Sequence, residues 1–506
     1  MSQIRVNDLS FTYEGSFEPV FEHTSFSIDT CWKLGLIGRN GKGKTTFLRL
    51  LSEKYPYTGT IDTQTVFDYF PYHISPEDRQ RPAAEFAETL KPLTEEWRII
   101  CELNLLGLSA DVLYRPFSTL SFGEQTKLML ALLFSGENDF LLIDEPTNHL
   151  DQTGRDSVKT YLAKKKGFIL VSHDRDLLDA CIDHVLVLNR HTIEVQAGNF
   201  SSWWENKRKK DQFAQSENEK HQKEIAKLKS AASQVKQWAE KSEESKIGFD
   251  PIKDPGHGSK RAYIGAKTKK MQSRVKQMEK RIEQEIEQKQ GLLQDIEAPV
   301  QLKIMPLTHE KTTLIAADNY SFQYQHTDRP LIQSLSFSIQ QGDRVILNGT
   351  NGCGKSSLIR AVLQKLEPAP SINWTESGSL RTASGLIVSY VNQDTSFLRG
   401  NLKAFCEQKG LPEPIFCALL RQLDMERSQF LKPMEEYSEG QKKKVLLAAS
   451  LLTPAHLYIW DEPLNYIDIF SRMQIENLIL TCRPTMLVVE HDTSFREKIG
   501  TKTIEL

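Results

Sequence analysis

The sequence lacks the long apolar runs, the leader and the paired cysteines that mark membrane and secreted proteins. No apolar stretch in its 506 residues approaches the roughly 18 residues that a bilayer crossing needs. The start, MSQIRVNDLSFTYEG, lacks the basic and apolar blocks of a signal peptide. Seven scattered cysteines without a Cys-x-x-Cys pair argue against a zinc site or a disulfide framework. We therefore expect a cytoplasmic protein without membrane contact, with reduced and mostly buried thiols.

The chain also carries little net charge, at −2, so attraction alone does not draw the whole protein to nucleic acid. The charge is unevenly distributed, however, because residues 201–300 contain 22 Lys and Arg against 16 Asp and Glu. With 39% hydrophobic and 26% charged residues, the composition is typical of folded domains. The length allows two such domains or more. We interpret the chain as a basic middle segment between more acidic domains.

An internal repeat defines these domains, because five landmarks recur in the same order in both halves. In each half a tyrosine precedes a glycine-rich loop by 25 residues, and three further motifs follow. The paired landmarks are Tyr13 and Tyr324, GRNGKGKT (38–45) and GTNGCGKS (349–356), LSFGEQ (120–125) and YSEGQK (437–442), LLIDEP (141–146) and YIWDEP (458–463), and SHD (172–174) and EHD (490–492). Since a repeat marks boundaries without any assumption about function, it predicts domains at 1–198 and 315–506 with a segment at 199–314 between them.

Short apolar runs around these landmarks predict the fold class. WKLGLIG and DRVILNG end at the glycine-rich loops, and an apolar-periodic stretch such as TTFLRLL follows, which indicates strand, loop and helix. DFLLID, GFILVS, HLYIW and TMLVV are typical of buried strands. Each domain is therefore predicted to be α/β with a mostly parallel sheet.

Both glycine-rich loops fit G-x-x-x-x-G-K-[ST], a pattern whose backbone N–H groups and following helix bind phosphates. Lys44 and Lys355 are predicted to neutralise the β- and γ-phosphates of ATP. A hydroxyl from each loop and an aspartate at the end of a later apolar strand are expected to hold Mg²⁺, largely through water. The predicted metal residues are Thr45, Asp144, Ser356 and Asp461.

A glutamate follows each of these aspartates, where its carboxylate can polarise a water in line with the γ-phosphate. Glu145 and Glu462 are therefore predicted to be catalytic bases. His173 and His491 follow the next strand, 28 and 29 residues further on, and are predicted to contact the γ-phosphate. A single glutamate or histidine in such a place is usually structural, but the repetition of the whole set favours function.

The ordered set of tyrosine, phosphate loop, signature, DEP and histidine resembles ATP-binding-cassette (ABC) domains, and LSFGEQ and YSEGQ are the discriminating motifs. We call residues 1–198 cassette one and residues 315–506 cassette two. The resemblance implies two ATPs sandwiched between the cassettes, so the chain pairs its own cassettes and acts as a monomer. Each signature then completes the site of the opposite cassette, and the two tyrosines stack on adenine. We call the site of Lys44 site one and that of Lys355 site two.

The loop motifs and this resemblance assign the nucleotide-binding positions. They are Tyr13, Gly38, Arg39, Asn40, Gly41, Lys42, Gly43, Lys44, Thr45, Thr46, Ser121, Gly123, Tyr324, Gly349, Thr350, Asn351, Gly352, Cys353, Gly354, Lys355, Ser356, Ser357, Gln393, Ser438 and Gly440.

Two departures from the family pattern fall on site one. Gln393, in YVNQ, resembles the glutamine that senses Mg²⁺ and the attacking water, so the resemblance adds it to the predicted metal residues, whereas the matching residue of YFPY is Tyr72. In the second signature Glu439 replaces a glycine and is expected to place a carboxylate near the phosphates. Site one is therefore predicted to turn over more slowly.

The middle segment is predicted to form a hairpin of two antiparallel helices. Residues 203–246 and 259–297 are highly charged and free of proline, and apolar residues recur every three or four positions. About 40 residues give each helix a length of roughly 60 Å. Residues 246–258 contain two prolines and three glycines and are predicted to be the tip. Phe249 and Ile252 in this tip either join the two helices or insert into a partner.

Two cassettes joined by a charged helical hairpin resemble the ABC-F family of translation factors over the whole chain. The resemblance implies a linker that enters the ribosomal tRNA exit site and reaches toward the P-site tRNA and the peptidyl-transferase centre. The extra arm of housekeeping members is absent, because 49 residues separate Tyr72 from Ser121 and 45 separate Gln393 from Ser438. The long tip, DEPLNYID (461–468) and FDYFPY (67–72) resemble the antibiotic-resistance branch, particularly its Lsa/Vga-type members.

This branch implies protection of the ribosome against lincosamides, streptogramin A and pleuromutilins. Three alternatives stay open: a general ABC-F translation factor, a fused double cassette that energises a membrane importer, and a cassette protein that binds DNA or RNA structures. The importer does not explain a hairpin of about 100 residues between the cassettes. The basic linker is compatible with the nucleic-acid alternative.

Overall fold

The structure is a computed structural model that describes residues 3–14, 19–39, 41–92, 94–136, 139–148, 150–189, 192–244, 277–278, 280–282, 304–325, 329–366, 374–423 and 425–506. The chain divides into two compact units, Met1–Trp203 with Pro299–Leu506, and Trp204–Ala298. The predicted hairpin tip at 246–258, with Phe249 and Ile252, and most of the second linker helix lie outside the described residues. They stay predictions, as do the domain boundaries.

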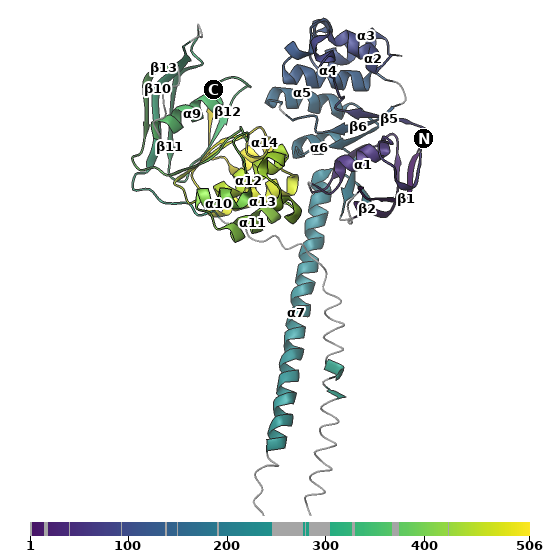
Figure 1. Cartoon of the computed structure of the whole chain (residues 1–506), viewed down its shortest axis with the longest axis vertical. Helices are drawn as coiled ribbons and strands as arrows, with labels where there is room; N and C mark the ends of the chain where they lie inside the picture. Colours follow the sequence, from purple (N-terminus) through teal and green to yellow (C-terminus); the bar gives the residue numbers. More distant parts are fainter. Residues whose placement is uncertain are drawn as a thin grey trace, which may run out of the picture. The chain divides into compact units, whose positions relative to one another are not determined.

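A largely parallel six-stranded sheet forms the centre of cassette one, as its apolar runs predict (Figure 1). Only its last strand runs antiparallel to its neighbour. In spatial order the strands are β5 (Val66–Phe70), β6 (Asp139–Asp144), β7 (Phe168–Val171), β3 (Lys33–Ile37), β8 (His184–Leu188) and β9 (Ile193–Ala197). A second, antiparallel sheet has the order β2 (Phe21–Asp29), β1 (Gln3–Phe11) and β4 (Thr58–Asp62).

The helices of cassette one follow the strands that carry the motifs. They are α1 (Lys44–Leu51), α2 (Ala83–Leu90), α3 (Glu96–Leu105), α4 (Phe122–Phe134), α5 (Gln152–Ala163) and α6 (Arg175–Cys181). The buried strands β3, β6 and β7 place their apolar side chains in one core with α1 and the antiparallel sheet. The carboxyl ends of the parallel strands therefore bring the phosphate loop, Asp144 and His173 to one edge of the sheet.

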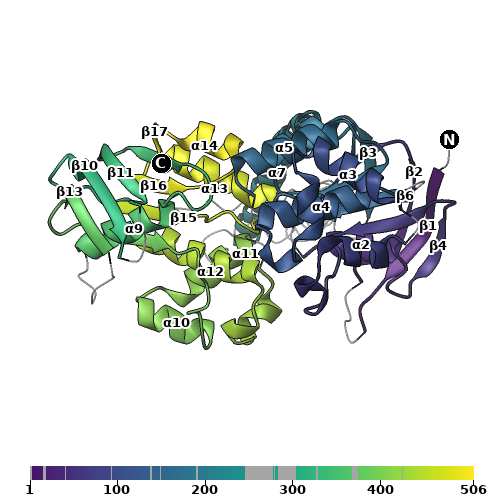
Figure 2. The ribbon, with the colours of Figure 1, turned by 90° about the horizontal axis from the view of Figure 1, so that it is seen from above.

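Cassette two repeats this architecture with a fully parallel sheet of five strands. In spatial order they are β14 (Val388–Val391), β15 (Leu457–Asp461), β16 (Met486–Val489), β12 (Arg344–Asn348) and β17 (Lys502–Glu505), and the antiparallel sheet is β11 (Ile332–Gln340), β10 (Thr313–Tyr324) and β13 (Trp374–Thr382). The helices are α9 (Lys355–Leu366), α10 (Leu402–Lys409), α11 (Glu413–Gln422), α12 (Glu439–Leu452), α13 (Ile469–Cys482) and α14 (Thr493–Ile499). Within this cassette, α10, α11 and α12 gather away from the antiparallel sheet (Figure 2).

The register of the two parallel sheets aligns Tyr69 of β5 with Tyr390 of β14. Each tyrosine lies beside the residue two places before the terminal aspartate of the neighbouring strand. Three residues further on, Tyr72 therefore occupies the place of Gln393. The alignment made from the repeat is thus the alignment of the fold.

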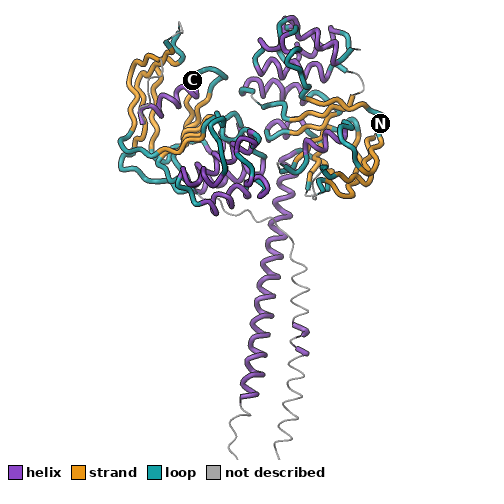
Figure 3. Tube along the Cα trace, in the orientation of Figure 1, coloured by secondary structure: helices purple, strands orange, loops and turns teal. Residues whose placement is uncertain are grey.

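The helix α7 (Phe200–Glu244) is continuous over 45 residues (Figure 3). It begins three residues before the predicted first linker helix, which was expected to start at Trp203. The side chains of Phe200 and Trp203 in its first turn are buried. At 1.5 Å per residue it is about 68 Å long. Within the described ranges, no helix has both the length and the apolar character that crossing a membrane requires.

All seven cysteines are free thiols, as predicted. The expectation that most of them are buried is wrong, because only Cys181 and Cys406 are.

Candidate functional site

Both phosphate loops curl around their own lysine. Lys44 Nζ donates hydrogen bonds to the carbonyl oxygens of Gly38 and Arg39 at 2.7 and 3.2 Å. Lys355 Nζ does the same to Gly349 and Thr350 at 2.7 and 2.9 Å. Burial lowers the pKa of Lys44. In both cassettes an ammonium group therefore lies at the loop where the sequence predicts phosphates.

The glycine before each lysine is required by the backbone. Gly43, the N-cap of α1, has a φ of 93°, and a Cβ there would lie 2.5 Å from Val20 Cγ1. Gly354 has a φ of 108°, and a Cβ there would lie 3.0 Å from Leu331 Cγ. Only glycine combines this left-handed conformation with such a close approach. Asn40 lies outside the described residues.

The predicted metal residues meet in pairs. Thr45 Oγ1 donates to Asp144 Oδ2 at 2.9 Å, and the Ser356 hydroxyl is bonded to Asp461. Burial raises the pKa of Asp461 to about 6, and its Oδ1 atom is buried without a hydrogen-bond partner among the described residues. A buried carboxylate oxygen that needs a partner fits a divalent cation. The residues present therefore fit Mg²⁺.

The two tyrosines assigned to adenine occupy equivalent places. Tyr13 and Tyr324 hydrogen-bond through their hydroxyls to Thr46 Oγ1 at 2.6 Å and Ser357 Oγ at 2.9 Å. Each hydroxyl is thus held by the helix that follows the phosphate loop. Tyr13 keeps 41% of its surface exposed.

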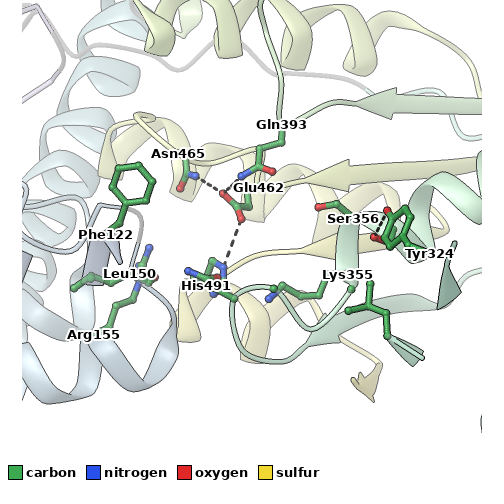
Figure 4. Close-up of a pocket in the computed structure, with 15 residues that line it drawn as sticks. Phe122, Leu150, Arg155, Tyr324, Lys355, Ser356, Gln393, Glu462, Asn465 and His491 are labelled. Carbon is green, nitrogen blue, oxygen red and sulfur yellow. Dashed lines mark hydrogen bonds and ion pairs between the residues drawn. The ribbon is translucent and has the colours of Figure 1, made fainter. Parts of the chain in front are cut away.

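Site two is a pocket of about 540 Å³ that contains side chains of both cassettes (Figure 4). Cassette two contributes Tyr324, Leu331, Asn351, Gly352, Gly354, Lys355, Ser356, Ser357, Gln393, Glu462, Asn465 and His491, and cassette one contributes Phe122, Leu150 and Arg155. The predicted Ser121 and Gly123 do not line this pocket. The Ser121 side chain instead forms a capping box with Glu124 at the start of α4.

Glu462 is held by several partners at the end of β15. Its Oε2 accepts hydrogen bonds from Gln393 Nε2 at 3.1 Å and from Asn465 Nδ2 at 2.7 Å. Its Oε1 lies 3.6 Å from His491 Nε2. Burial alone would raise the pKa of Glu462, but His491, Lys443 and Asn465 outweigh it and lower the pKa. The carboxylate is therefore ionised and oriented, as a base for water requires.

Glu145, at the end of β6, has a much poorer set of partners. Its Oε2 accepts from the backbone N–H of His173 at 3.4 Å. Its Oε1 lies 3.3 Å from His173 Nε2, but it accepts no well-aligned hydrogen bond from the described residues. Burial, followed by the charge of Asp144, raises the pKa of Glu145 to about 8. Burial and nearby cations hold the pKa of His173 well below its usual range, so its imidazole is neutral.

The exchange of glutamine for tyrosine explains part of this difference. Gln393 reaches Glu462, whereas the Tyr72 hydroxyl donates to Asp68 Oδ2 at 2.6 Å. Asp68 is also paired with Lys91 Nζ at 2.7 Å. The Tyr72 side chain is therefore bonded to Asp68 in the preceding strand, β5, instead of to Glu145.

The second signature contributes to site one through a pocket of about 400 Å³. Ser438 and Gly440 line it together with Glu145, Asn148, His173, Glu439, Gln441, Lys444 and Tyr466. The Glu439 carboxylate, which was expected near the phosphates, accepts a hydrogen bond from Thr395 Oγ1 at 2.7 Å and lies 3.7 Å from Lys442 Nζ. Its charge is therefore partly compensated within cassette two.

Sequence reasoning missed three residues of these sites. Asn465 bonds Glu462, and its signal was available because Asn148 stands at the same place in the repeat. Tyr69 donates from its hydroxyl to Asp144 Oδ2 at 3.0 Å, and burial raises its pKa. Arg155, which lines site two from the opposite cassette, has no counterpart in the motifs used.

The chain matches one protein family and is similar to several known proteins. The model of the ABC transporter family matches residues 21–148 and 332–465. The ribosome protection protein VmlR of Bacillus subtilis (strain 168) is 28% identical over 503 residues, which cover 96% of this chain and 84% of the relative. The erythromycin resistance ATP-binding protein MsrA of Staphylococcus epidermidis is 29% identical over 499 residues, which cover 94% of this chain and 92% of the relative.

Among solved structures, an archaeal ribosome recycling factor, aABCE1, crystallised with a ribosomal stalk protein, matches with a TM-score of 0.60 at 16% identity. The match covers 98% of this chain and 87% of that one. At this identity the likeness concerns the fold alone. It confirms the predicted arrangement of two ABC ATPase domains in one chain.

Proposed function

The chain belongs to the ABC transporter family, as a double ABC ATPase of the ABC-F type, and on that premise we propose that it is a ribosome-associated ATPase that protects the large subunit against antibiotics. The observation that carries this proposal is a pair of pockets at Glu462 and Glu145, each with residues of both cassettes, in a chain that also contains a long charged helix. The relatives VmlR and MsrA support it through their names, which refer to ribosome protection and erythromycin resistance.

In this proposal the residues of each site divide the work of ATP hydrolysis. Lys44 and Lys355 neutralise the phosphates that the loop N–H groups bind. Glu145 and Glu462 accept the proton of the water that attacks the γ-phosphorus, as the bond to the β-phosphate oxygen breaks and ADP leaves. Mg²⁺, held by the Thr45–Asp144 and Ser356–Asp461 pairs, would supply positive charge to the phosphates.

The linker is the part proposed to act on the ribosome. We propose that residues 199–314 enter the tRNA exit site next to the P-site tRNA, and that hydrolysis releases them. The support is the basic excess of residues 201–300 and the length of α7, about 68 Å, which suits reach into a large partner. The drugs expected to be countered are lincosamides, streptogramin A and pleuromutilins.

Ribosome association is tested with a form that binds ATP but cannot hydrolyse it. Glu145→Gln with Glu462→Gln keeps the side-chain size and removes both bases, so ATP should hold the protein on 70S ribosomes in co-sedimentation. Lys44→Ala with Lys355→Ala is the matched control that should stay in the supernatant. If the glutamine variant binds ATP and still stays free of ribosomes, the proposal is wrong.

Drug protection is tested separately, because a general translation factor would also bind ribosomes. Expression should raise the inhibitory concentrations of lincomycin and tiamulin, and erythromycin belongs in the panel because of the name of MsrA. Shortening residues 246–258 should abolish the effect and leave ATPase activity intact. Unchanged susceptibility together with intact ribosome binding would favour the general factor.

A further inference from the structure

Cassette one contains a further groove beside site one, with which it shares Tyr69. It has a volume of about 830 Å³ and lies between the end of α1 and strand β5 with the loop that follows. This volume falls within the range of roughly 300–1,000 Å³ that is usual for ligand pockets. We call it the Tyr72 groove, and its characteristic lining residues are Arg49, Lys54, Tyr55, Tyr69, Tyr72 and His73.

The groove combines half-buried aromatic rings with an exposed lysine and an exposed imidazole. Tyr55, Tyr69 and Tyr72 are half-buried, whereas Lys54 and His73 are exposed. Lys54 Nζ lies 5.2 Å from the centre of the Tyr69 ring. Rings that can stack and cations at the rim are the chemistry that binds an unstacked base and its phosphate.

The local charge of the groove also favours an anion. Arg49 Nη1 donates to the Tyr55 hydroxyl at 3.1 Å, so the guanidinium is held at the hydroxyl end of this tyrosine. The acidic side chain in the groove, Asp68, is neutralised by Lys91 at 2.7 Å. Arg49 and Lys54 therefore leave the groove with an excess of positive charge.

The corresponding place in cassette two lacks most of these features. Counting from the aligned lysines and tyrosines, Arg49 and Lys54 match Arg360 and Lys365, which keep the charge. In contrast, the positions of Tyr55, Tyr72 and His73 hold Leu366, Gln393 and Asp394. At these three positions cassette one therefore has two tyrosines and a histidine where cassette two has a leucine, a glutamine and an aspartate.

We propose that the Tyr72 groove binds a nucleotide of ribosomal RNA, with its base against the tyrosines and its phosphate at Arg49 and Lys54. This inference rests on the proposed ribosome association and assigns part of the RNA contact to cassette one. It also accounts for Tyr72. A tyrosine at this position lacks the amide that a glutamine would provide, and this brings no evident benefit to site one.

The test uses the full chain with Glu145→Gln and Glu462→Gln, purified 70S ribosomes and ATP. Adding Lys54→Ala with His73→Ala removes the lysine charge and the imidazole at the rim, and adding Tyr72→Leu removes a stacking ring. Each should weaken binding roughly tenfold, and the cation variant should flatten the salt dependence by about one unit of slope per phosphate lost. The matched control, Lys365→Ala with Asp394→Asn in cassette two, should leave both quantities unchanged.

Chemical probing of the ribosomal RNA identifies the occupant. The parent should protect one or a few bases that become reactive with Tyr72→Leu and stay protected with the cassette-two control. With hydrolysis intact, Lys54→Ala with His73→Ala should leave ribosome-free ATPase activity within twofold of the parent.

Three results separate the possible failures. If the parent does not sediment with ribosomes, the proposed function fails and this inference with it. If the parent binds and the groove variants bind equally with the same protections, the inference alone is overturned. If the variants bind more weakly but no base changes reactivity, the groove contacts a ribosomal protein and the RNA assignment is wrong.

Discussion

The two catalytic glutamates should give the two sites opposite pH behaviour. Burial raises the pKa of Glu145 to about 8, whereas the partners of Glu462 lower its pKa below the ordinary value. A base works only when ionised. Site one should therefore speed up as the pH rises, and site two should be insensitive above pH 6.

The size of the effect follows from the pKa of Glu145. With a pKa of about 8, about a tenth of the carboxyl is ionised at pH 7 and about nine-tenths at pH 9. Turnover at site one should thus rise roughly tenfold over this interval. The pKa of His173 is already well below its usual range, so its imidazole stays neutral and does not contribute. Bound phosphates add negative charge and would move the rise to higher pH.

The assay isolates each site with one substitution. Glu462→Gln leaves site one active and Glu145→Gln leaves site two active, and steady-state ATPase rates are compared from pH 6 to 9. Because the pKa of Lys44 is lowered, loss of its positive charge at high pH would weaken nucleotide binding, so ATP must be saturating at every point. A ratio of rates at pH 9 and pH 7 below two for site one, equal to that of site two, would refute the reasoning.

Two further predictions concern the groups around the carboxylates. Gln393→Ala, in the Glu145→Gln background, should slow ATP hydrolysis at site two about tenfold to a hundredfold at pH 6.5 and less at pH 8.5. The reason is that Glu462 loses a hydrogen-bond donor, which raises its pKa. Equal losses of rate at the two pH values would contradict this. Tyr69→Phe should raise the Mg²⁺ concentration for half-maximal activity at site one about tenfold, because Asp144 loses an orienting hydroxyl. The control is Tyr390→Phe, because the Tyr390 hydroxyl donates to Asn392 at 3.1 Å instead of to an aspartate. A magnesium titration that is identical for both variants would contradict the role of Tyr69.

The repeat made much of the fold predictable, because a glycine-rich loop after an apolar strand has few alternatives. Gly43 shows why: its φ of 93° and the close approach of Val20 leave no other residue possible. The parallel sheets and their alignment follow from the same apolar runs. Local physical constraints were therefore visible in the order of residues.

What sequence reasoning could not provide are contacts that depend on packing between distant segments. The bond from Thr395 to Glu439 joins residues 44 positions apart and turns an expected liability into a paired carboxylate. The direction of the Tyr72 side chain likewise depends on Asp68, which Lys91 neutralises. No periodicity or spacing encodes such pairings.

The exchange of glutamine for tyrosine at position 72 connects the slower turnover predicted for site one with the proposed RNA contact. A glutamine there would give the Glu145 carboxylate a hydrogen-bond donor, as Gln393 does for Glu462. With a tyrosine there, Glu145 lacks this donor while burial and Asp144 raise its pKa to about 8, and the tyrosine ring lines the groove instead. The Tyr69 ring lines the same groove and its hydroxyl bonds Asp144, so a base bound in the groove would touch a side chain of site one. In this proposal, slow hydrolysis at site one and recognition of the ribosome by cassette one are two results of one substitution, and a long-lived ATP at this site would prolong the bound state while site two completes its cycle.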